Sequence, residues 1–347
     1  MSPANRRVVS PIVTAYRLVN ERAAIGARLG GVVQATNEWG MDAVSDRKTL
    51  GFVGLGVMGE PMCRHLAQKS GASVLGCDIS PEPFTRLAEF GVAAAASLGE
   101  VMRGADMVFV SLPSGQHLEA VCRGDDGLLA HARPGQTLID LGTSPVHLTQ
   151  QLAKDFAAKG VLYADAPVAR TREAAEQGKL AIMVGAGEEL FAQIEPLLRC
   201  FATDVTRCGE VGAGQVVKIL NNMVVVGTVV ALSEAAAIAR SFGVDTPGLF
   251  DTFSKGSADS FALRNHGIKF VAQDTFPTRV FSTEYMLKDI RYAADMARLE
   301  SIDVQALDYA CRLLEQAVAD GHGAQYWPVV STLIGPNLPP IGKGQGG

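Results

Sequence analysis

A glycine-rich turn near residue 54 is the feature that most constrains what this chain can fold into. The segment Gly54-Leu55-Gly56-Val57-Met58-Gly59 follows the apolar run 50–53 and precedes a segment with helical spacing. In a GxGxxG turn the first glycine permits the tight bend, the second lets the backbone approach a pyrophosphate, and the third lets the helix pack on the strand. The helix then aims its first amides at the anion.

This turn predicts a dinucleotide site, in which residues 54–58 contact the cofactor. The alternative for the same pattern is a glycine turn that only packs a strand against a helix. We therefore take as predicted cofactor contacts Gly54, Leu55, Gly56, Val57 and Met58.

An acidic residue after the second predicted strand supports the dinucleotide interpretation. Asp78 follows the run 73–77 and lies about 20 residues beyond the last glycine of the turn. A carboxylate at this position accepts hydrogen bonds from a ribose 2′-OH and repels a 2′-phosphate. The next arginine after Asp78 is Arg86. The sequence therefore predicts NAD as cofactor, in preference to NADP.

Composition and charge exclude several classes of protein. The chain has 347 residues, of which 48 % are hydrophobic and 19 % charged, enough for a large core and two domains. A net charge of −5 gives no broad basic field, so we expect neither nucleic acid nor an anionic membrane as a partner. The apolar stretch 223–232 is about half as long as a membrane span needs.

The six cysteines form no CxxC pair and lie mostly in apolar runs. This usage predicts buried thiols in a reducing compartment, with neither a disulfide framework nor a zinc site, and no metal is expected.

The order of short apolar runs and helical segments predicts an α/β fold followed by an all-helical domain. Residues 47–210 alternate between the two kinds of segment, as in a parallel sheet covered by helices on both faces. After the Gly212-Ala213-Gly214 turn, one long helix reaches about residue 240 and leaves the nucleotide domain. We expect a helical domain over 211–334 and a flexible tail, rich in glycine and proline, over 335–347.

Residues 1–46 differ in kind from the rest of the chain. Their first 30 residues hold five arginines and one acidic residue, Glu21, with no apolar core of the secretory type. We expect a non-folded extension, or a reading frame that begins upstream of a start at Met41. The alternative is an organellar transit peptide, so we expect a cytoplasmic protein unless that alternative holds.

Lys218 is the candidate proton-transfer group. It lies in the first turns of the long helix, with Asn221 and Asn222 three and four residues later on the same face. A lysine buried on an apolar helix can exchange a proton with a substrate hydroxyl. The alternative is a lysine that extends out of an apolar face while the asparagines bond to neighbouring backbone.

Five motifs together resemble the β-hydroxyacid dehydrogenase family, and most of all its 3-hydroxyisobutyrate dehydrogenase group. They are GLGVMGEPM, DLGTSP, DAPV, GAGQVVKILNN and MLKD, and they occur in the family's order over residues 48 to about 330. The resemblance implies a Rossmann domain that binds NAD or NADP. It also implies a helical domain that supports homodimers or homotetramers, and a cleft that holds a small 3-hydroxy acid.

The resemblance also implies roles for single residues. Lys218 matches the catalytic lysine, and Asn222 matches an asparagine that orients the substrate. Leu112 and Pro113 match the segment that lines the adenosine half of the cofactor, and Thr143 matches a residue beside the nicotinamide ribose. Lys288 matches a second lysine that closes over the cofactor, with a solvated helix charge as the alternative.

The loop after Asp165-Ala166-Pro167-Val168 departs from the family, which usually has Ser-Gly-Gly there. This chain has Ala169-Arg170-Thr171, which we take as substrate-binding residues. The planar guanidinium of Arg170 can bind an oxyanion through two parallel hydrogen bonds. This version of the loop resembles that of 3-sulfolactaldehyde reductases. The alternative is that Arg170 pairs with an acid such as Glu173, outside the pocket.

Ser257, in the run 256–261, is a further candidate for the substrate pocket. Together these residues predict an NAD-dependent enzyme that interconverts a small anionic 3-hydroxy acid and its aldehyde or keto form. One alternative is a sulfolactaldehyde reductase or another short-semialdehyde reductase. Others, from different classes, are a non-catalytic dinucleotide-binding protein and an imine-reducing paralogue, against which the retention of Lys218 and Asn222 argues.

Overall fold

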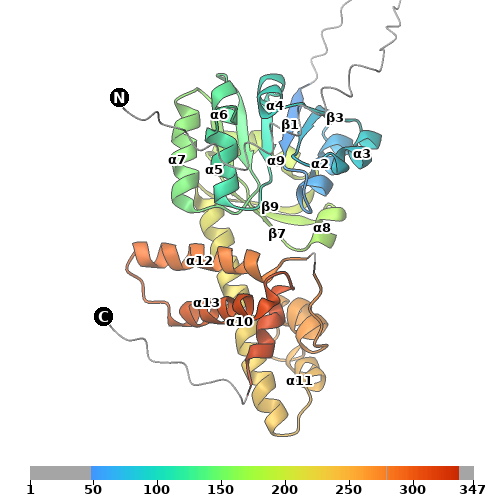
Figure 1. The fold of residues 1–347 in the computed structure, drawn as a ribbon, viewed down its shortest axis with the longest axis vertical. Helices are drawn as coiled ribbons and strands as arrows, with labels where there is room; N and C mark the ends of the chain where they lie inside the picture. The colour runs from blue at the N-terminus through green and yellow to red at the C-terminus, as the bar shows by residue number, and fades with distance from the viewer. Residues whose placement is uncertain (1–47, 279, 336–347) are drawn as a thin grey trace, which may run out of the picture. The chain divides into compact units, whose positions relative to one another are not determined.

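The computed structural model describes residues 48–278 and 280–335, and they form two compact units (Figure 1). The first unit ends at Lys218 and the second begins at Ile219, so the division falls inside the long helix α10 (Ala213–Ser241). The sequence placed the domain boundary earlier, between residues 210 and 211. The predicted extension 1–46 lies outside the described residues, as does all of the predicted tail after Gly335.

A nine-stranded sheet forms the centre of the first unit. Six neighbouring strands, in the order β3-β2-β1-β4-β5-β6, are all parallel, which is the order of doubly wound dinucleotide-binding sheets. The strands are β1 (Thr49–Val53), β2 (Ser73–Cys77), β3 (Val92–Ala94), β4 (Met107–Val110), β5 (Thr137–Asp140), β6 (Leu162–Asp165), β7 (Val168–Ala169), β8 (Leu180–Gly185) and β9 (Ala202–Gly209).

The far end of the sheet changes direction. Strand β8 pairs antiparallel with β6 and β7, and β9 then pairs parallel with β8. The sequence predicts strands over 50–53, 73–77, 107–112, 137–141, 162–165, 180–185 and 204–208, and all seven are present, with ends that differ by at most two residues. It missed β3 and β7, which have only three and two residues, too few for an alternating pattern to be recognised.

Both faces of this sheet are buried, as its apolar strands predict. Phe52 belongs to one core cluster, which includes residues of α2 and α9, whereas the adjacent Val53 belongs to another, which includes residues of α4, α5 and α7. The helices of this unit are α2 (Gly59–Lys69), α3 (Glu82–Leu87), η2 (Ala88–Phe90), α4 (Leu98–Gly104), α5 (Gly115–Arg123), α6 (Leu128–His131), α7 (Val146–Ala157), α8 (Arg172–Glu176) and α9 (Glu188–Leu198).

The second unit is helical throughout its described part, where the only extended pairing is two isolated bridges. Leu232 of α10 packs with Phe250 and Leu263 in one core cluster. His266 lies nearby in sequence and shares a 2.7 Å hydrogen bond between its Nδ1 and the Tyr326 hydroxyl. The remaining helices are α11 (Thr246–Phe253), η3 (Leu263–Val271), α12 (Thr283–Leu299), α13 (Gln305–Ala317), η4 (Val318–His322) and η5 (Trp327–Leu333).

Helix α10 is unusually long and apolar, with 29 residues. In the part of the chain that the structure describes, it is the one helix whose length and composition would let it cross a membrane. A core helix of a soluble protein meets the same criterion, and 44 % of the most apolar window of α10 is buried inside the protein. The criterion therefore does not distinguish the two kinds of helix here.

Candidate functional site

The glycine turn between β1 and α2 has the geometry that its sequence predicts. Gly54 has a φ of +90°, and its amide donates to the Cys77 carbonyl over 2.9 Å. A Cβ on Gly54 would overlap the Ser111 carbonyl, and one on Gly59 would overlap the Gly54 carbonyl. A Cβ on Gly56 would meet no atom within 4 Å, so this side of the turn is open to an approaching anion.

The residues around the turn fit the pyrophosphate and ribose of a dinucleotide. Helix α2 starts with Met58 as its N-cap, which provides no side-chain cap for the first amides of the helix. Asp78 lies beside the turn because its Oδ2 accepts from the Leu55 amide over 2.6 Å, while its Oδ1 accepts from the Ser80 amide over 2.7 Å. The carboxylate is thus held at the end of β2, where the sequence placed the ribose contact.

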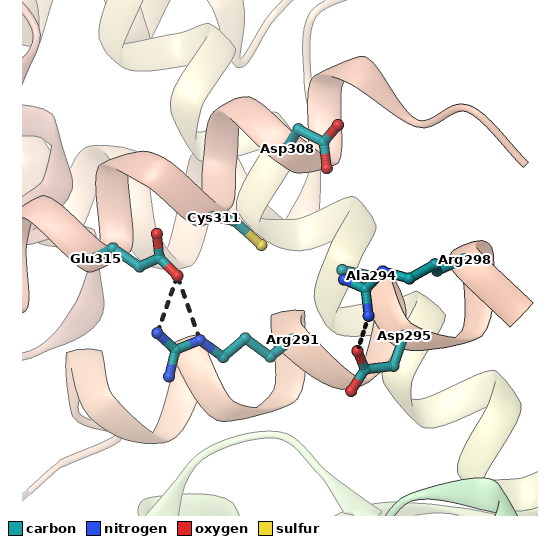
Figure 2. A pocket seen from close by; sticks show the side chains of 7 residues that line it. All are labelled: Arg291, Ala294, Asp295, Arg298, Asp308, Cys311 and Glu315. Atoms are coloured by element: carbon teal, nitrogen blue, oxygen red, sulfur yellow. Dashed lines mark hydrogen bonds and ion pairs between the residues drawn. The ribbon is translucent and has the colours of Figure 1, made fainter. Parts of the chain in front are cut away.

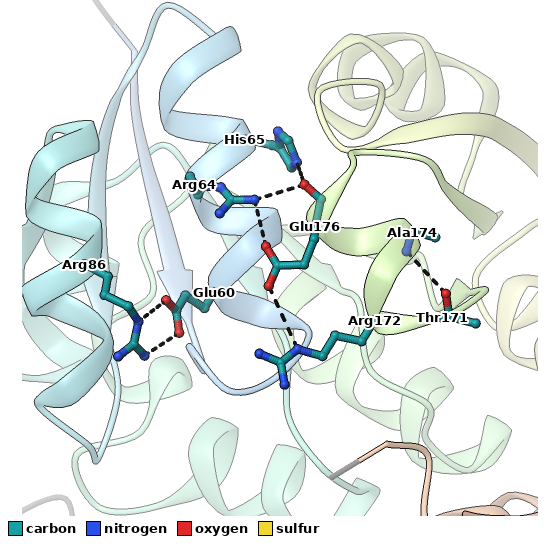
Figure 3. Close-up of polar contacts among 8 residues, drawn as sticks. All are labelled: Glu60, Arg64, His65, Arg86, Thr171, Arg172, Ala174 and Glu176. Atoms are coloured by element: carbon teal, nitrogen blue, oxygen red, sulfur yellow. Dashed lines mark hydrogen bonds and ion pairs between the residues drawn. The ribbon is translucent and has the colours of Figure 1, made fainter. Parts of the chain in front are cut away.

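Arg86, the first arginine after Asp78 in the sequence, is held in an ion pair with Glu60. Arg86 of α3 donates from Nε and Nη2 to the two carboxylate oxygens of Glu60, over 2.6 and 2.7 Å (Figure 3). Because Glu60 holds this guanidinium through both bonds, Arg86 is engaged at the surface. Figure 3 also shows Arg64 of α2 donating to the Glu176 carboxylate over 2.9 Å, which ties α2 to α8.

The other predicted cofactor contacts of the first unit follow the ends of parallel strands. Leu112 and Pro113 come directly after β4, and Thr143 comes after β5. Because β4 and β5 are adjacent and parallel, these segments leave the same edge of the sheet, which is where such sheets bind ligands. Leu112 and Thr143 are half-buried and Pro113 is exposed.

Lys218 and Asn222 lie one turn apart on α10, and both side chains are buried, with 8 % and 5 % exposure. Within the second unit, Asn222 donates from Nδ2 to Asp289 Oδ2 over 2.8 Å. The other oxygen of Asp289 lies 3.1 Å from Lys288 Nζ. Asp289 is itself only 1 % exposed, so it is a buried carboxylate that links two predicted site residues.

Sequence reasoning missed Asp289, although it stands in the MLKD motif next to Lys288. It also missed Gln215, which lies between the second glycine and the lysine of GAGQVVK. Both residues lie inside motifs that carry the family resemblance, and that position is the signal in the sequence that points to them.

Lys288 is also placed against two aromatic rings of α12. Its Nζ lies 5.6 Å from the ring centre of Tyr285 and 5.5 Å from that of Tyr292. With Asp289 as its ion-pair partner, the ammonium is held on a defined face of the helix. This placement is more specific than that of a solvated helix charge.

Arg170 has a different environment from the anion site that the sequence predicted. Its guanidinium donates to Asp204 Oδ2 over 2.6 Å, to the Thr203 hydroxyl over 2.7 Å and to the Lys179 carbonyl over 2.6 Å. The Thr203 hydroxyl and then the Arg170 guanidinium hold the pKa of Asp204 below its ordinary value. The geometry favours the alternative, an ion pair with an acid, and that acid is Asp204 rather than Glu173.

The backbone of Arg170 is strained, with a φ of +84°. A non-glycine residue rarely adopts this conformation, whereas glycine does so readily. This position corresponds to the first glycine of the usual Ser-Gly-Gly loop, so the arginine keeps a turn that suits glycine. Its three side-chain hydrogen bonds hold that turn in place.

The remaining predicted substrate residues are Ala169 and Thr171 in the first unit and Ser257 in the second. Ala169 is buried in the short strand β7. The Thr171 hydroxyl caps α8 by accepting from the Ala174 amide over 3.3 Å (Figure 3). Ser257 lies in an exposed turn after α11.

A cavity of about 290 Å³ lies elsewhere, between α12 and α13. Figure 2 shows that its two arginines are paired, Arg291 with Glu315 and Arg298 with Asp295, at 2.9 and 2.7 Å. A third acid, Asp308, also lines it. Because the lining has no unbalanced positive charge, it does not suit a small anion, and none of the predicted site residues lines it.

Two family models cover most of the described chain. The model described as the NAD binding domain of 6-phosphogluconate dehydrogenase matches residues 49–209. The model described as NAD-binding of NADP-dependent 3-hydroxyisobutyrate dehydrogenase matches residues 212–327. The junction between them coincides with the start of α10.

Individual relatives agree with these models. A 2-(hydroxymethyl)glutarate dehydrogenase of Eubacterium barkeri is 30 % identical, over 80 % of this chain and 91 % of its own length. An NAD-dependent L-serine dehydrogenase of Pseudomonas aeruginosa is 28 % identical, over 83 % and 98 %. The structure of a Mycobacterium tuberculosis 3-hydroxyisobutyrate dehydrogenase with L-serine matches with a TM-score of 0.75 and 31 % identity, over 82 % and 98 %.

Proposed function

The chain belongs to the β-hydroxyacid dehydrogenases related to 3-hydroxyisobutyrate dehydrogenase, and from this premise we propose that it oxidises a small 3-hydroxy acid at Lys218. It is an NAD-binding oxidoreductase with a Rossmann domain and a helical second domain. The proposal concerns the residues that carry the reaction and the class of substrate.

Each residue of the proposed site has one task. Asp78 binds the adenosine ribose, and the amides at the start of α2 bind the pyrophosphate. Lys218 accepts the hydroxyl proton during oxidation and returns it during reduction. Asn222 orients the substrate, held in turn by Asp289. NAD, when bound, supplies the hydride acceptor.

The observation that carries the proposal is the buried pair on α10. Lys218 and Asn222 are less than a tenth exposed and follow each other at the spacing of one helical turn. A buried lysine needs a polar environment, since an isolated charge is costly to bury. A hydrogen-bonded asparagine and the substrate hydroxyl supply such an environment.

The first experiment compares the wild type with Lys218→Met, which keeps the length and apolar body of the side chain. Initial rates of NADH formation are measured on 3-hydroxyisobutyrate, 3-hydroxypropionate, L-serine, D-glycerate, 4-hydroxybutyrate and sulfolactate. We expect turnover of a carboxylate substrate and a loss of about 10²- to 10⁴-fold in kcat for Lys218→Met, the range typical of general acid-base groups. Near-normal turnover by a folded Lys218→Met would contradict the mechanism.

The same panel tests the alternatives. A strong preference for sulfolactate supports a sulfolactaldehyde reductase instead. NADH binding without turnover on any of the six compounds supports a non-catalytic dinucleotide-binding protein. The pairing of Arg170 with Asp204 gives the sulfonate alternative no support from the geometry.

A homo-oligomer assembled through α10 is also part of the proposal. Val224 and Ile238, two heptads apart on this helix, are 64 % and 62 % exposed, and Phe242 is 83 % exposed. An apolar stripe at this spacing suits packing against another helix, and a second copy of the chain provides one. Sedimentation of the wild type and of Val224→Lys/Ile238→Lys tests this. We expect the substitutions to shift a dimer or tetramer toward the monomer.

We also propose the reducing, cytoplasmic compartment that the sequence predicts, and the thiols support its reducing character. All six cysteines are free, and Cys63, Cys77, Cys122 and Cys200 are buried. Burial raises the pKa of these thiols, which keeps them protonated and unreactive.

A further inference from the structure

The side chain of Gln215 holds the backbone on both sides of Thr143. Its Oε1 accepts from the Ser144 amide over 3.1 Å, and its Nε2 donates to the Gly142 carbonyl over 2.9 Å. Gln215 has no exposed surface. The loop that carries Thr143 is thus fixed by one buried amide from the first turn of α10.

That first turn is itself anchored to the sheet. Asp165, at the end of β6, accepts from the Gly212 amide over 2.6 Å with Oδ1 and from the Gln215 amide over 2.8 Å with Oδ2. A Cβ on Gly214 would lie 2.8 Å from Asp165 Oδ2, and one on Gly185 would overlap the same carboxylate. The helix therefore starts in close contact with the ends of β6 and β8.

Lys218 is three residues beyond Gln215 and so lies on the same side of α10. Two residues of the first unit are both fixed relative to Gln215: Thr143, which the family resemblance assigns to the nicotinamide ribose, and Lys218, the proposed proton acceptor. We propose that Gln215 is a positioning residue that sets Thr143 and Lys218 in one geometry, with Asp165 anchoring the helix. This inference rests on the proposed function.

The chemistry of the contact explains why the residue is glutamine. The site requires one acceptor for the Ser144 amide and one donor for the Gly142 carbonyl. The Asp140 carboxylate also lies 3.4 Å from the Gln215 Nε2. Glutamate keeps the acceptor but turns the donor into a second carboxylate oxygen, which repels Gly142 O and Asp140. Methionine fills the volume and makes neither bond.

Gln136 provides a matched control at the other end of β5. It too has no exposed surface, and its Oε1 accepts from the Arg133 amide over 2.8 Å. Its Nε2 donates to the Ala105 carbonyl over 2.7 Å and to the Met102 carbonyl. Gln136→Met thus removes a comparable set of buried hydrogen bonds far along the strand from Thr143.

The experiment compares Gln215→Met, Gln215→Glu and Gln136→Met in the full chain. The Kd for NADH is measured by fluorescence. The values of kcat and KM are measured with 3-hydroxyisobutyrate and L-serine as substrates. The kinetic isotope effect on kcat uses substrate deuterated at the hydroxyl-bearing carbon, and Tm is recorded for each variant. We expect both methionine variants to lose similar Tm, whereas kcat falls about 100-fold only in the Gln215 variants, as for a reacting group displaced by about 1 Å.

Substrate KM and the NADH Kd should change by less than about threefold in the Gln215 variants, and the isotope effect should rise because hydride transfer becomes rate-limiting. Equal kcat in Gln215→Met and Gln136→Met, or a loss in Gln215→Met that appears only as weaker NADH binding, overturns the inference. If Gln215→Met does not fold, Gln215→Asn decides, since it keeps a neutral amide on a side chain that is one methylene shorter. Full activity of Gln215→Met beside an inactive Lys218→Met refutes this inference alone, whereas an active Lys218→Met refutes the proposed function.

Discussion

Asn222 donates a hydrogen bond to Asp289 over 2.8 Å, although 67 residues separate them in the chain. Asp289 is 1 % exposed, so this bond replaces water that the carboxylate has lost. If Asn222 orients the substrate, Asp289 acts through it as a positioning residue.

We therefore expect Asp289→Ala to lower kcat/KM by about 10- to 100-fold, the equivalent of a lost hydrogen bond to a charged group. Asp289→Asn keeps an acceptor oxygen of the same size and should recover most of this loss. Steady-state kinetics of both variants, with Tm as a check on folding, make the comparison. Equal losses in the two variants would mean that the charge, rather than the hydrogen bond, is required.

Arg170→Gly should change substrate KM by no more than roughly twofold, since the exposed guanidinium pairs with Asp204 rather than with a ligand. Glycine also relieves the φ of +84°, which offsets the lost contacts, so only a small change in Tm is expected. Asp204→Asn removes the charge of the partner and leaves the arginine, and it should likewise change substrate KM by no more than roughly twofold. A tenfold rise in KM for Arg170→Gly alone would restore the anion site that the sequence predicted.

Asp78→Asn should reduce the preference for NAD over NADP. Removing one unit charge a few ångströms from a 2′-phosphate near the surface is worth on the order of 1–4 kcal/mol, so the ratio of the two kcat/KM values should fall by about tenfold or more. The control is Asp106→Asn, another carboxylate that accepts a backbone amide, from Thr49, at the opposite end of the parallel strands. An unchanged ratio in Asp78→Asn would place the ribose contact elsewhere.

His266 makes the stability of the second unit depend on pH. Burial, and secondarily the charge of Lys269, lowers its pKa from 6.5 to about 4. The unfolded chain therefore binds a proton that the folded chain does not, and the free energy of unfolding is highest above pH 6.5 and falls as the pH drops toward 4. The loss amounts to at most about 3 kcal/mol. The free energy of unfolding, measured with urea at pH 7, 5.5 and 4.5, should fall less steeply with decreasing pH in His266→Asn than in the wild type.

The sequence predicted features that depend on neighbouring residues. The glycine turn, the position of Asp78 after β2 and the helix that carries Lys218 follow from local spacing, because a few adjacent residues determine each of them. The parallel sheet followed from the alternation of strands with helices. These features needed no knowledge of distant contacts.

Features that depend on tertiary contacts were not predictable in this way. Arg170 finds Asp204 on β9, 34 residues away, across strands whose pairing no local pattern specifies. Glu173, the partner that the sequence predicted, instead accepts a hydrogen bond from the side chain of Gln177, four residues later at the end of α8. Gln215 was missed because a glutamine in a helix suggests an exposed side chain, and only the folded sheet shows the two peptide groups it bonds.

The continuity of α10 limits how this protein can be recombined with its relatives. The two units divide between Lys218 and Ile219, yet Lys218 and Asn222 owe their spacing to one unbroken backbone ladder. A chimera joined at that division pairs the lysine of one parent with the asparagine of another. A junction before Gly212 keeps that pair intact, but the start of the other parent's helix must then donate its amides to Asp165 of this chain. Exchange of the second unit therefore preserves the chemistry only if the new helix also brings a glutamine at position 215.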